Sequence, residues 1–187
     1  MDKEINNAIA NFFLNDSREY LKRYDLLKGI QTDIANRSKL LIDIVFSFEC
    51  SFKALIFIES TTDEKETYKM IKDCGHDLRK LIGKVKSEHV ADLVSKIDDN
   101  FEHFSISSRY TLEANIYFRN STGVLDNLYY STIANHIWLD ELYISSKKIN
   151  EYVASKIVNS LSRINFEQID LEKLLTKTKR INSVRKK

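Results

Sequence analysis

The chain has 187 residues, a formal net charge of +2, 43% hydrophobic and 30% charged residues, 4 glycines and no proline. This composition is typical of one folded domain, and it excludes a disordered chain and, with only 2 cysteines, a disulfide framework. The scarcity of Gly and Pro argues against the many tight turns of a sandwich or barrel and favours long helices.

The first predicted helix covers residues 16–30. Tyr and Leu side chains recur there at helical spacing, and Asp16 or Ser17 is a suitable N-cap, so we expect the helix to begin at one of them. The residues before it lack a basic segment followed by an apolar run. We therefore expect no secretory signal and a cytoplasmic protein.

Residues 36–59 are apolar on nearly every side, which predicts a helix at the centre of the fold. Glu49 and Lys53 lie one turn apart within it, in the favoured order for an ion pair, and each needs the other if both are buried. These charges interrupt the apolar run before it reaches the roughly 20 residues of a membrane span. We therefore expect no membrane partner.

A shorter helix is expected over residues 61–75. Thr62 or Asp63 would be its N-cap, and Gly75 can adopt the left-handed conformation that ends a helix. Asp77 follows at once and is a suitable N-cap for a second short helix. This part of the chain should therefore turn sharply between two short helices.

The second half of the chain carries weaker signals. An apolar stripe with a start signal at Ser87 predicts a helix over 87–104, whereas the Ser, Thr and Asn content of 105–123 favours a loop or a short extended segment. Residues 124–164 fit one long helix or two consecutive ones, and a short helix is expected over 166–180.

These elements predict an all-α fold, with a single antiparallel helical bundle over residues 1–165 and a short C-terminal helix with a basic tail over 166–187. No acid follows Glu172, and the basic residues after it are Lys173, Lys177, Lys179, Arg180, Arg185, Lys186 and Lys187. Such a tail can touch nucleic-acid phosphates without reading sequence, and it equally suits a solvated terminus. Lys179 and Arg180 are its candidates for contact with a nucleic acid or a partner.

Three stretches in order along the chain carry a family resemblance: FECSFKAL with Glu49, GHDLRKL with His76 and Asp77, and SRYT with Arg109. Together they resemble the HEPN (higher eukaryotes and prokaryotes nucleotide-binding) superfamily, over residues 17–160. The resemblance implies an HEPN-like helical bundle that usually forms a homodimer. It also implies a link to RNA, in a toxin–antitoxin pair or in phage defence, with a nucleotidyltransferase-like or antitoxin partner.

Active members of that superfamily are metal-independent ribonucleases with an Arg followed, after four to six residues, by a His. The His handles the proton of the attacking ribose hydroxyl, and the Arg holds the charge that develops on the phosphate. In this chain no Arg stands at that distance before any of the 4 histidines. Arg119 and Asn120 resemble the first half of the motif, but Val124, Leu125 and Asp126 occupy the positions where the His belongs.

A non-standard catalytic pair would have to use other residues. Lys96 and His103 keep the separation, although Lys lacks the planar fork of Arg. His103 and Arg109 form the reversed pair, and they are the catalytic candidates if the chain is a ribonuclease. Arg119 and Asn120, in the polar segment, are candidates for contact with a nucleic acid or a partner.

For His76 a structural role is favoured. The resemblance implies that the His-Asp-Leu sequence marks the start of a helix, so we expect His76 and Asp77 to form a structural polar cluster with Glu49 and Lys53. Cys74 and His76 would supply two of the four ligands of a structural zinc site, and no second pair has suitable spacing. We therefore expect no metal and no cofactor.

The broken motif favours an HEPN-like protein that binds RNA or a partner and carries a degenerate ribonuclease motif. Two alternatives stay open at this point. One is an active metal-independent endoribonuclease with a non-standard site, acting as a toxin. The other is a helical scaffold with no role in nucleic-acid binding.

Overall fold

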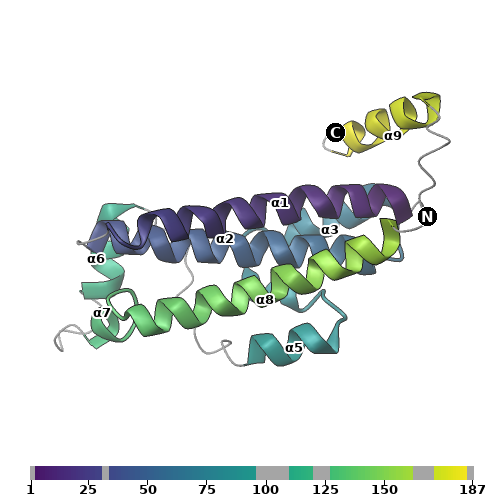
Figure 1. Cartoon of the computed structure of the whole chain (residues 1–187). Coiled ribbons are helices and arrows are strands. Elements are labelled where there is room, and N and C mark those ends of the chain that lie inside the picture. The colour runs from purple at the N-terminus through teal and green to yellow at the C-terminus, as the bar shows by residue number, and fades with distance from the viewer. Residues whose placement is uncertain (1–2, 31–33, 96–109, 120–126, 162–170, 185–187) are drawn as a thin grey trace.

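The computed structural model describes residues 3–30, 34–95, 110–119, 127–161 and 171–184, and the regular structure in these ranges is entirely helical. The prediction of an all-α fold is therefore confirmed. In chain order the helices are α1 (Lys3–Leu27), α2 (Ile34–Glu59), α3 (Glu64–Cys74), α4 (Leu78–Ile82), α5 (Glu88–Ser95), α6 (Thr111–Arg119), α7 (Asn127–Ser131), α8 (His136–Leu161) and α9 (Leu171–Ser183) (Figure 1). Within the described ranges, none of these helices combines the length and the apolar character that crossing a membrane requires.

The three long helices α1, α2 and α8 pack side by side and hold the core between them (Figure 1). Phe48, Phe52 and Leu55, in the middle of α2, are fully buried. Helix α2 is in contact with α1, α8, α6, α4 and α3, so it is covered on nearly every side. This explains its apolar sequence, and the predicted central helix is confirmed.

A layer of small polar side chains crosses this core. We call it the hydroxyl layer. It consists of Ser17 of α1, Ser47 and Ser51 of α2, and Ser146 and Asn150 of α8, all buried. The Ser17 hydroxyl lies 2.7 Å from that of Ser47 and 2.9 Å from that of Ser51, and the Ser47 hydroxyl lies 2.8 Å from that of Ser146. The Asn150 amide nitrogen donates to the Ser17 hydroxyl at 2.9 Å. These contacts fix the axial register of the three helices.

The predicted start of the first helix is wrong. Helix α1 begins at Lys3, and neither Asp16 nor Ser17 caps it. Ile5, Ile9 and other apolar residues of the first turns are buried, so their helical spacing carries the same apolar stripe toward the N-terminus. The Ser17 hydroxyl, whose capping tendency suggested a helix start, is satisfied instead inside the hydroxyl layer.

The predicted loop over 105–123 is wrong for the part of it that the structure describes. Residues 111–119 form α6, in which Ala114 and Phe118 lie one turn apart and are buried. Helix α6 packs against α2, so tertiary contact outweighs the polar composition of the segment. The open choice between one long helix and two over 124–164 is settled by Asn135, whose side chain accepts the backbone N–H of Ile137 at 3.0 Å and caps a separate α8.

The predicted turn between two short helices is confirmed. The Asp63 carboxylate caps α3 by accepting the backbone N–H groups of Lys65 and Glu66, both at 2.9 Å. Gly75 ends α3 with φ +61°, a left-handed conformation that favours glycine. The Asp77 carboxylate then caps α4. The chain therefore turns within three residues, 75–77, which brings α4 against α2.

Candidate functional site

His76 lies in the turn between α3 and α4 and points back to the middle of α2. Its Nδ1 donates to the Glu49 carboxylate, 2.9 Å from Oε2 and 3.1 Å from Oε1. The Lys53 ammonium lies 2.5 Å from Glu49 Oε1. The Glu49 side chain is only 5% exposed, whereas that of His76 is 57% exposed. The structure thus brings three members of the predicted polar cluster together around one buried carboxylate.

Asp77 does not contact Glu49 directly. Its carboxylate accepts the backbone N–H of Lys80 at 3.1 Å and lies 3.5 Å from the Lys80 ammonium. Asp77 therefore serves the start of α4, and it fixes the turn from which the His76 ring reaches Glu49.

The Glu49–His76 pair resembles the carboxylate and imidazole of a catalytic triad in one respect, because the carboxylate fixes the ring through Nδ1. The ring's Nε2 makes no hydrogen bond with the described residues, and it could exchange a proton with a bound molecule. A nucleophile or a phosphate-binding Arg would have to stand beside it for catalysis. Among the described residues, the His76 ring contacts the Glu49 carboxylate and the Phe46 ring, and both contacts hold the turn on α2.

A cavity lies between α3 and α4, and we call it the α3–α4 groove. It has a volume of about 630 Å³ and opens to solvent. Its lining residues are Glu66, Lys69, Met70, Asp73, Cys74, Arg79, Lys80, Gly83 and Lys84. Four of them are cationic and two are acidic. The groove is therefore a site of net positive charge, which suits an anionic ligand.

A second cavity, of about 370 Å³, continues the groove toward the end of α2. It shares Glu66, Met70, Gly83 and Lys84 with the first, and its further charged residues are Glu59 and Lys86. The Lys86 backbone N–H donates to the Glu59 carboxylate at 2.6 Å, which ties the segment after α4 to the C-terminus of α2. The two cavities are therefore neighbours, and the lysines that line them are exposed.

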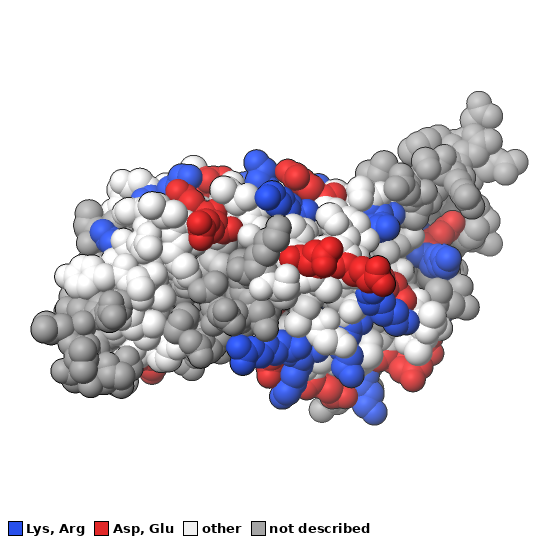
Figure 2. Space-filling model, turned by 90° about the horizontal axis from the view of Figure 1, so that it is seen from below, with Lys and Arg blue, Asp and Glu red and all other residues white. Residues whose placement is uncertain are grey.

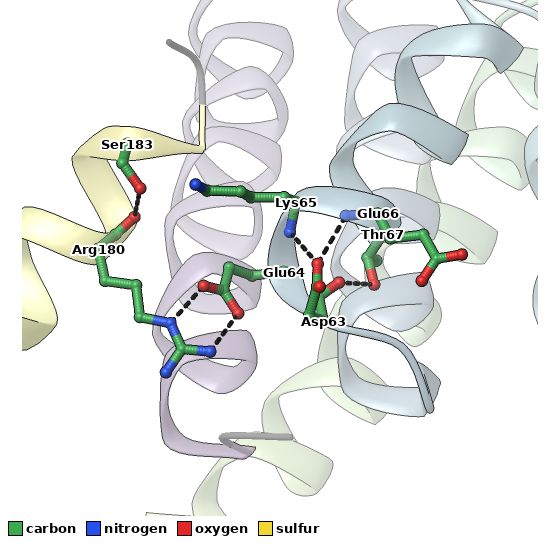
Figure 3. Close-up of polar contacts among 7 residues, drawn as sticks. All are labelled: Asp63, Glu64, Lys65, Glu66, Thr67, Arg180 and Ser183. Atoms are coloured by element: carbon green, nitrogen blue, oxygen red, sulfur yellow. Dashed lines mark hydrogen bonds and ion pairs between the residues drawn. The ribbon is translucent and has the colours of Figure 1, made fainter. Parts of the chain in front are cut away.

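The C-terminal helix α9 lies at the end of the long helices where α1 begins (Figure 1). Arg180, one of the two predicted contact residues of the tail, forms a bidentate ion pair with Glu64 in the first turn of α3 (Figure 3). Lys179, the other, is exposed. Hydrogen bonds from the backbone of Glu66 and Lys65 hold the pKa of the neighbouring Asp63 below its usual range.

The remaining predicted site residues lie at or beyond the edge of what the structure describes. Arg119 is the last residue of α6. Asn120 and both catalytic candidates, His103 and Arg109, fall outside the described residues. The reversed pair therefore stays a prediction.

In the described ranges, no three His, Cys, Asp or Glu side chains are grouped closely enough to hold a metal ion. Both cysteines are free, and Cys74 is buried. Burial, together with the neighbouring charge of Glu49, raises the pKa of the Cys50 thiol to about 12, so this thiol stays protonated at neutral pH and is a poor nucleophile.

Sequence reasoning did not single out the α3–α4 groove. Its lysines look like ordinary surface charges, and only the turn at Gly75 brings Lys69 of α3 and the cations of α4 to one cavity. A usable signal is the set of 7 Lys and Arg residues over 65–86, as many as follow Glu172 in the C-terminal tail.

No protein-family model matches the chain, and neither does any curated protein or solved structure.

Proposed function

We propose that this chain is an HEPN-like antiparallel helical bundle that binds RNA through the α3–α4 groove and does not cleave it with the usual Arg and His pair. The resemblance supplies the setting, a prokaryotic toxin–antitoxin or phage-defence system in the cytoplasm, with an antitoxin or nucleotidyltransferase-like protein as a further partner. The groove supplies the place where RNA would bind.

The observation that carries this proposal is the convergence of cations on an open cavity. Lys69 of α3 and Lys84 after α4 line the same groove, together with Arg79 and Lys80 of α4. Phosphate contacts by Lys and Arg supply most of the affinity of sequence-independent nucleic-acid binding. A groove with cations on both edges can follow a single-stranded backbone.

Removing two groove lysines should weaken RNA binding and reduce its dependence on salt. Lys69→Ala combined with Lys84→Ala is expected to lower affinity for a short single-stranded RNA about tenfold at low salt. It should also reduce the slope of log K against log salt by about 1.4, since each lost single-strand phosphate contact contributes about 0.7. Fluorescence anisotropy titrations at several salt concentrations measure both quantities.

The matched control is Lys147→Ala combined with Lys148→Ala, which removes two exposed lysines of α8 and gives the same change in net charge. Equal losses in the two double variants would contradict a specific role of the groove. Absence of RNA binding by the wild-type chain even at low salt would favour the scaffold alternative.

We also propose a homodimer formed through one end of the helical assembly. Seven of the exposed large apolar side chains in the described ranges lie at the end that holds α6 and α7: Leu26, Ile30, Tyr110, Ile116, Tyr130, Ile137 and Ile144. This end lies at the left in Figure 2, as it does in Figure 1. Exposed large apolar side chains gathered on one part of a surface are typical of a protein interface.

Ile137→Asp should therefore convert a dimer into a monomer without unfolding it, because this side chain is 72% exposed in the isolated chain. Sedimentation velocity over a concentration series measures the mass, and thermal unfolding checks the fold. Lys148→Asp, an exposed position on the same helix, is the control and should leave the dimer intact. A monomeric wild-type chain at all concentrations would refute this proposal.

A further inference from the structure

Two ion pairs join helix α9 to α3 and α1. The Arg180 guanidinium donates to both carboxylate oxygens of Glu64, through Nε to Oε1 and through Nη2 to Oε2 at 2.9 Å (Figure 3). The Glu64 side chain is 4% exposed, so this carboxylate is almost completely removed from water. One turn earlier on α9, the Lys177 ammonium lies 3.4 Å from the Glu4 carboxylate of α1.

The buried Glu64 carboxylate requires a counter-ion. A buried carboxylate that loses its counter-ion carries a substantial desolvation cost, so the geometry strongly favours a cation at this position. The planar fork of Arg satisfies both oxygens at once, which a Lys could not do.

The apolar part of the α9 contact is poorly filled. Ile181 and Val184 of α9 face Ile9 and Phe13 of α1 across a cavity of about 290 Å³, which Tyr68 of α3 also lines. Ile181 and Val184 are only partly buried where they pack against the core, so the apolar contact of α9 is limited, and the ion pairs add to it.

We propose that α9 is a releasable latch. While it is docked, Glu64 and Glu4 pair with Arg180 and Lys177, which would otherwise contact RNA phosphates. This rests on the proposed RNA binding and adds a means of regulating it. While α9 is docked, Arg180 and Lys177 are engaged by carboxylates, and a phosphate backbone has to compete with them. When α9 undocks, its cations become available together with Lys179, which is exposed in the docked state.

The Glu64 carboxylate and an RNA phosphate compete for the same Arg180 guanidinium. Arg binds a carboxylate and a phosphate with the same bidentate geometry, so one guanidinium cannot serve both. RNA binding by α9 and docking of α9 therefore exclude each other, and each should weaken the other by the same factor.

The test uses Glu64→Gln in the full chain. This variant keeps the size of the side chain, removes the charge that holds Arg180 and leaves every cation in place. Two readouts are measured: hydrogen–deuterium exchange of the α9 amides, which reports undocking, and affinity for a short single-stranded RNA. We expect α9 to exchange about tenfold faster, since hydrogen bonds to charged groups are among the stronger ones, and RNA to bind several-fold more tightly.

Two controls separate the latch from a simple change in net charge. Glu141→Gln alters the charge equally at an exposed position of α8 and should change neither readout. Arg180→Gln breaks the same pair from the other side, so it should speed exchange in α9 without tightening RNA binding. If Glu64→Gln proves poorly folded, Arg180→Gln still shows by amide exchange whether breaking this ion pair undocks α9.

The outcomes distinguish this inference from the proposed function. Wild-type binding of RNA that Glu64→Gln leaves unchanged would overturn the latch alone, and so would unchanged exchange in α9. Failure of both the wild type and Glu64→Gln to bind RNA would overturn the proposed function and the latch with it.

Discussion

Replacing Asn150 by Ala is expected to lower the free energy of unfolding by about 2–3 kcal/mol. The Asn150 amide nitrogen donates to the Ser17 hydroxyl at 2.9 Å and to the Ser146 carbonyl at 3.1 Å, and it lies 3.2 Å from the Ser51 hydroxyl. All these groups are buried. Alanine would leave them without their common donor and would open a small void between the three long helices.

The control is Ser155→Ala on the same helix, where the hydroxyl is exposed and donates to the Tyr152 carbonyl of its own helix at 2.7 Å. We expect the free energy of unfolding of this variant, measured by urea titration, to lie within about 0.5 kcal/mol of the wild-type value. Ser17→Ala should show a non-additive effect with Asn150→Ala, because the two side chains share a hydrogen bond. Equal stability of the Asn150 and Ser155 variants would show that the hydroxyl layer contributes nothing to stability.

The second large effect concerns Asp43 and pH. Burial raises the pKa of the Asp43 carboxyl to about 6, and Arg23, whose Nη2 lies 3.1 Å from Oδ1, offsets only part of this. The other carboxylate oxygen has no hydrogen-bond partner among the described residues. Because the folded pKa exceeds the unfolded value, the folded state binds more protons between about pH 4 and 6, and the free energy of unfolding should fall as pH rises through this window.

Asp43→Asn should remove this dependence. At pH 7.5 we expect the variant to be more stable than the wild type by about 1–3 kcal/mol, and the difference should shrink as pH falls below 6. Urea unfolding at a series of pH values measures it, and Asp73→Asn at an exposed position of α3 controls for the change in net charge. A difference that does not vary with pH would contradict the burial of a charged carboxyl here.

Local sequence signals are sufficient to predict the helix ends that the adjacent residues themselves determine. Asp63, Gly75 and Asp77 mark helix ends through their own backbone and side-chain chemistry, and the structure places the ends of α3 and the start of α4 at these residues. The pairing of Glu49 with Lys53 likewise follows from a spacing of one helical turn.

The features that local signals missed are those made by residues far apart in the chain. Nothing in the sequence places the serines of the hydroxyl layer beside one another, and only the register of three helices brings them together. For the same reason, local signals alone make Ser17 look like a helix cap. Glu64 and Arg180 are 116 residues apart, so nothing in the tail alone indicated that one of its cations is already paired.

The central claim is that the chain binds RNA in the α3–α4 groove and leaves it intact, and one incubation tests it most directly. The purified protein is mixed with a labelled single-stranded RNA without added metal, and binding and RNA length are followed together. We expect salt-sensitive binding that Lys69→Ala with Lys84→Ala weakens, and RNA of unchanged length. Cleavage products that disappear on replacing His103 or Arg109 by Ala would contradict the claim and identify an active ribonuclease.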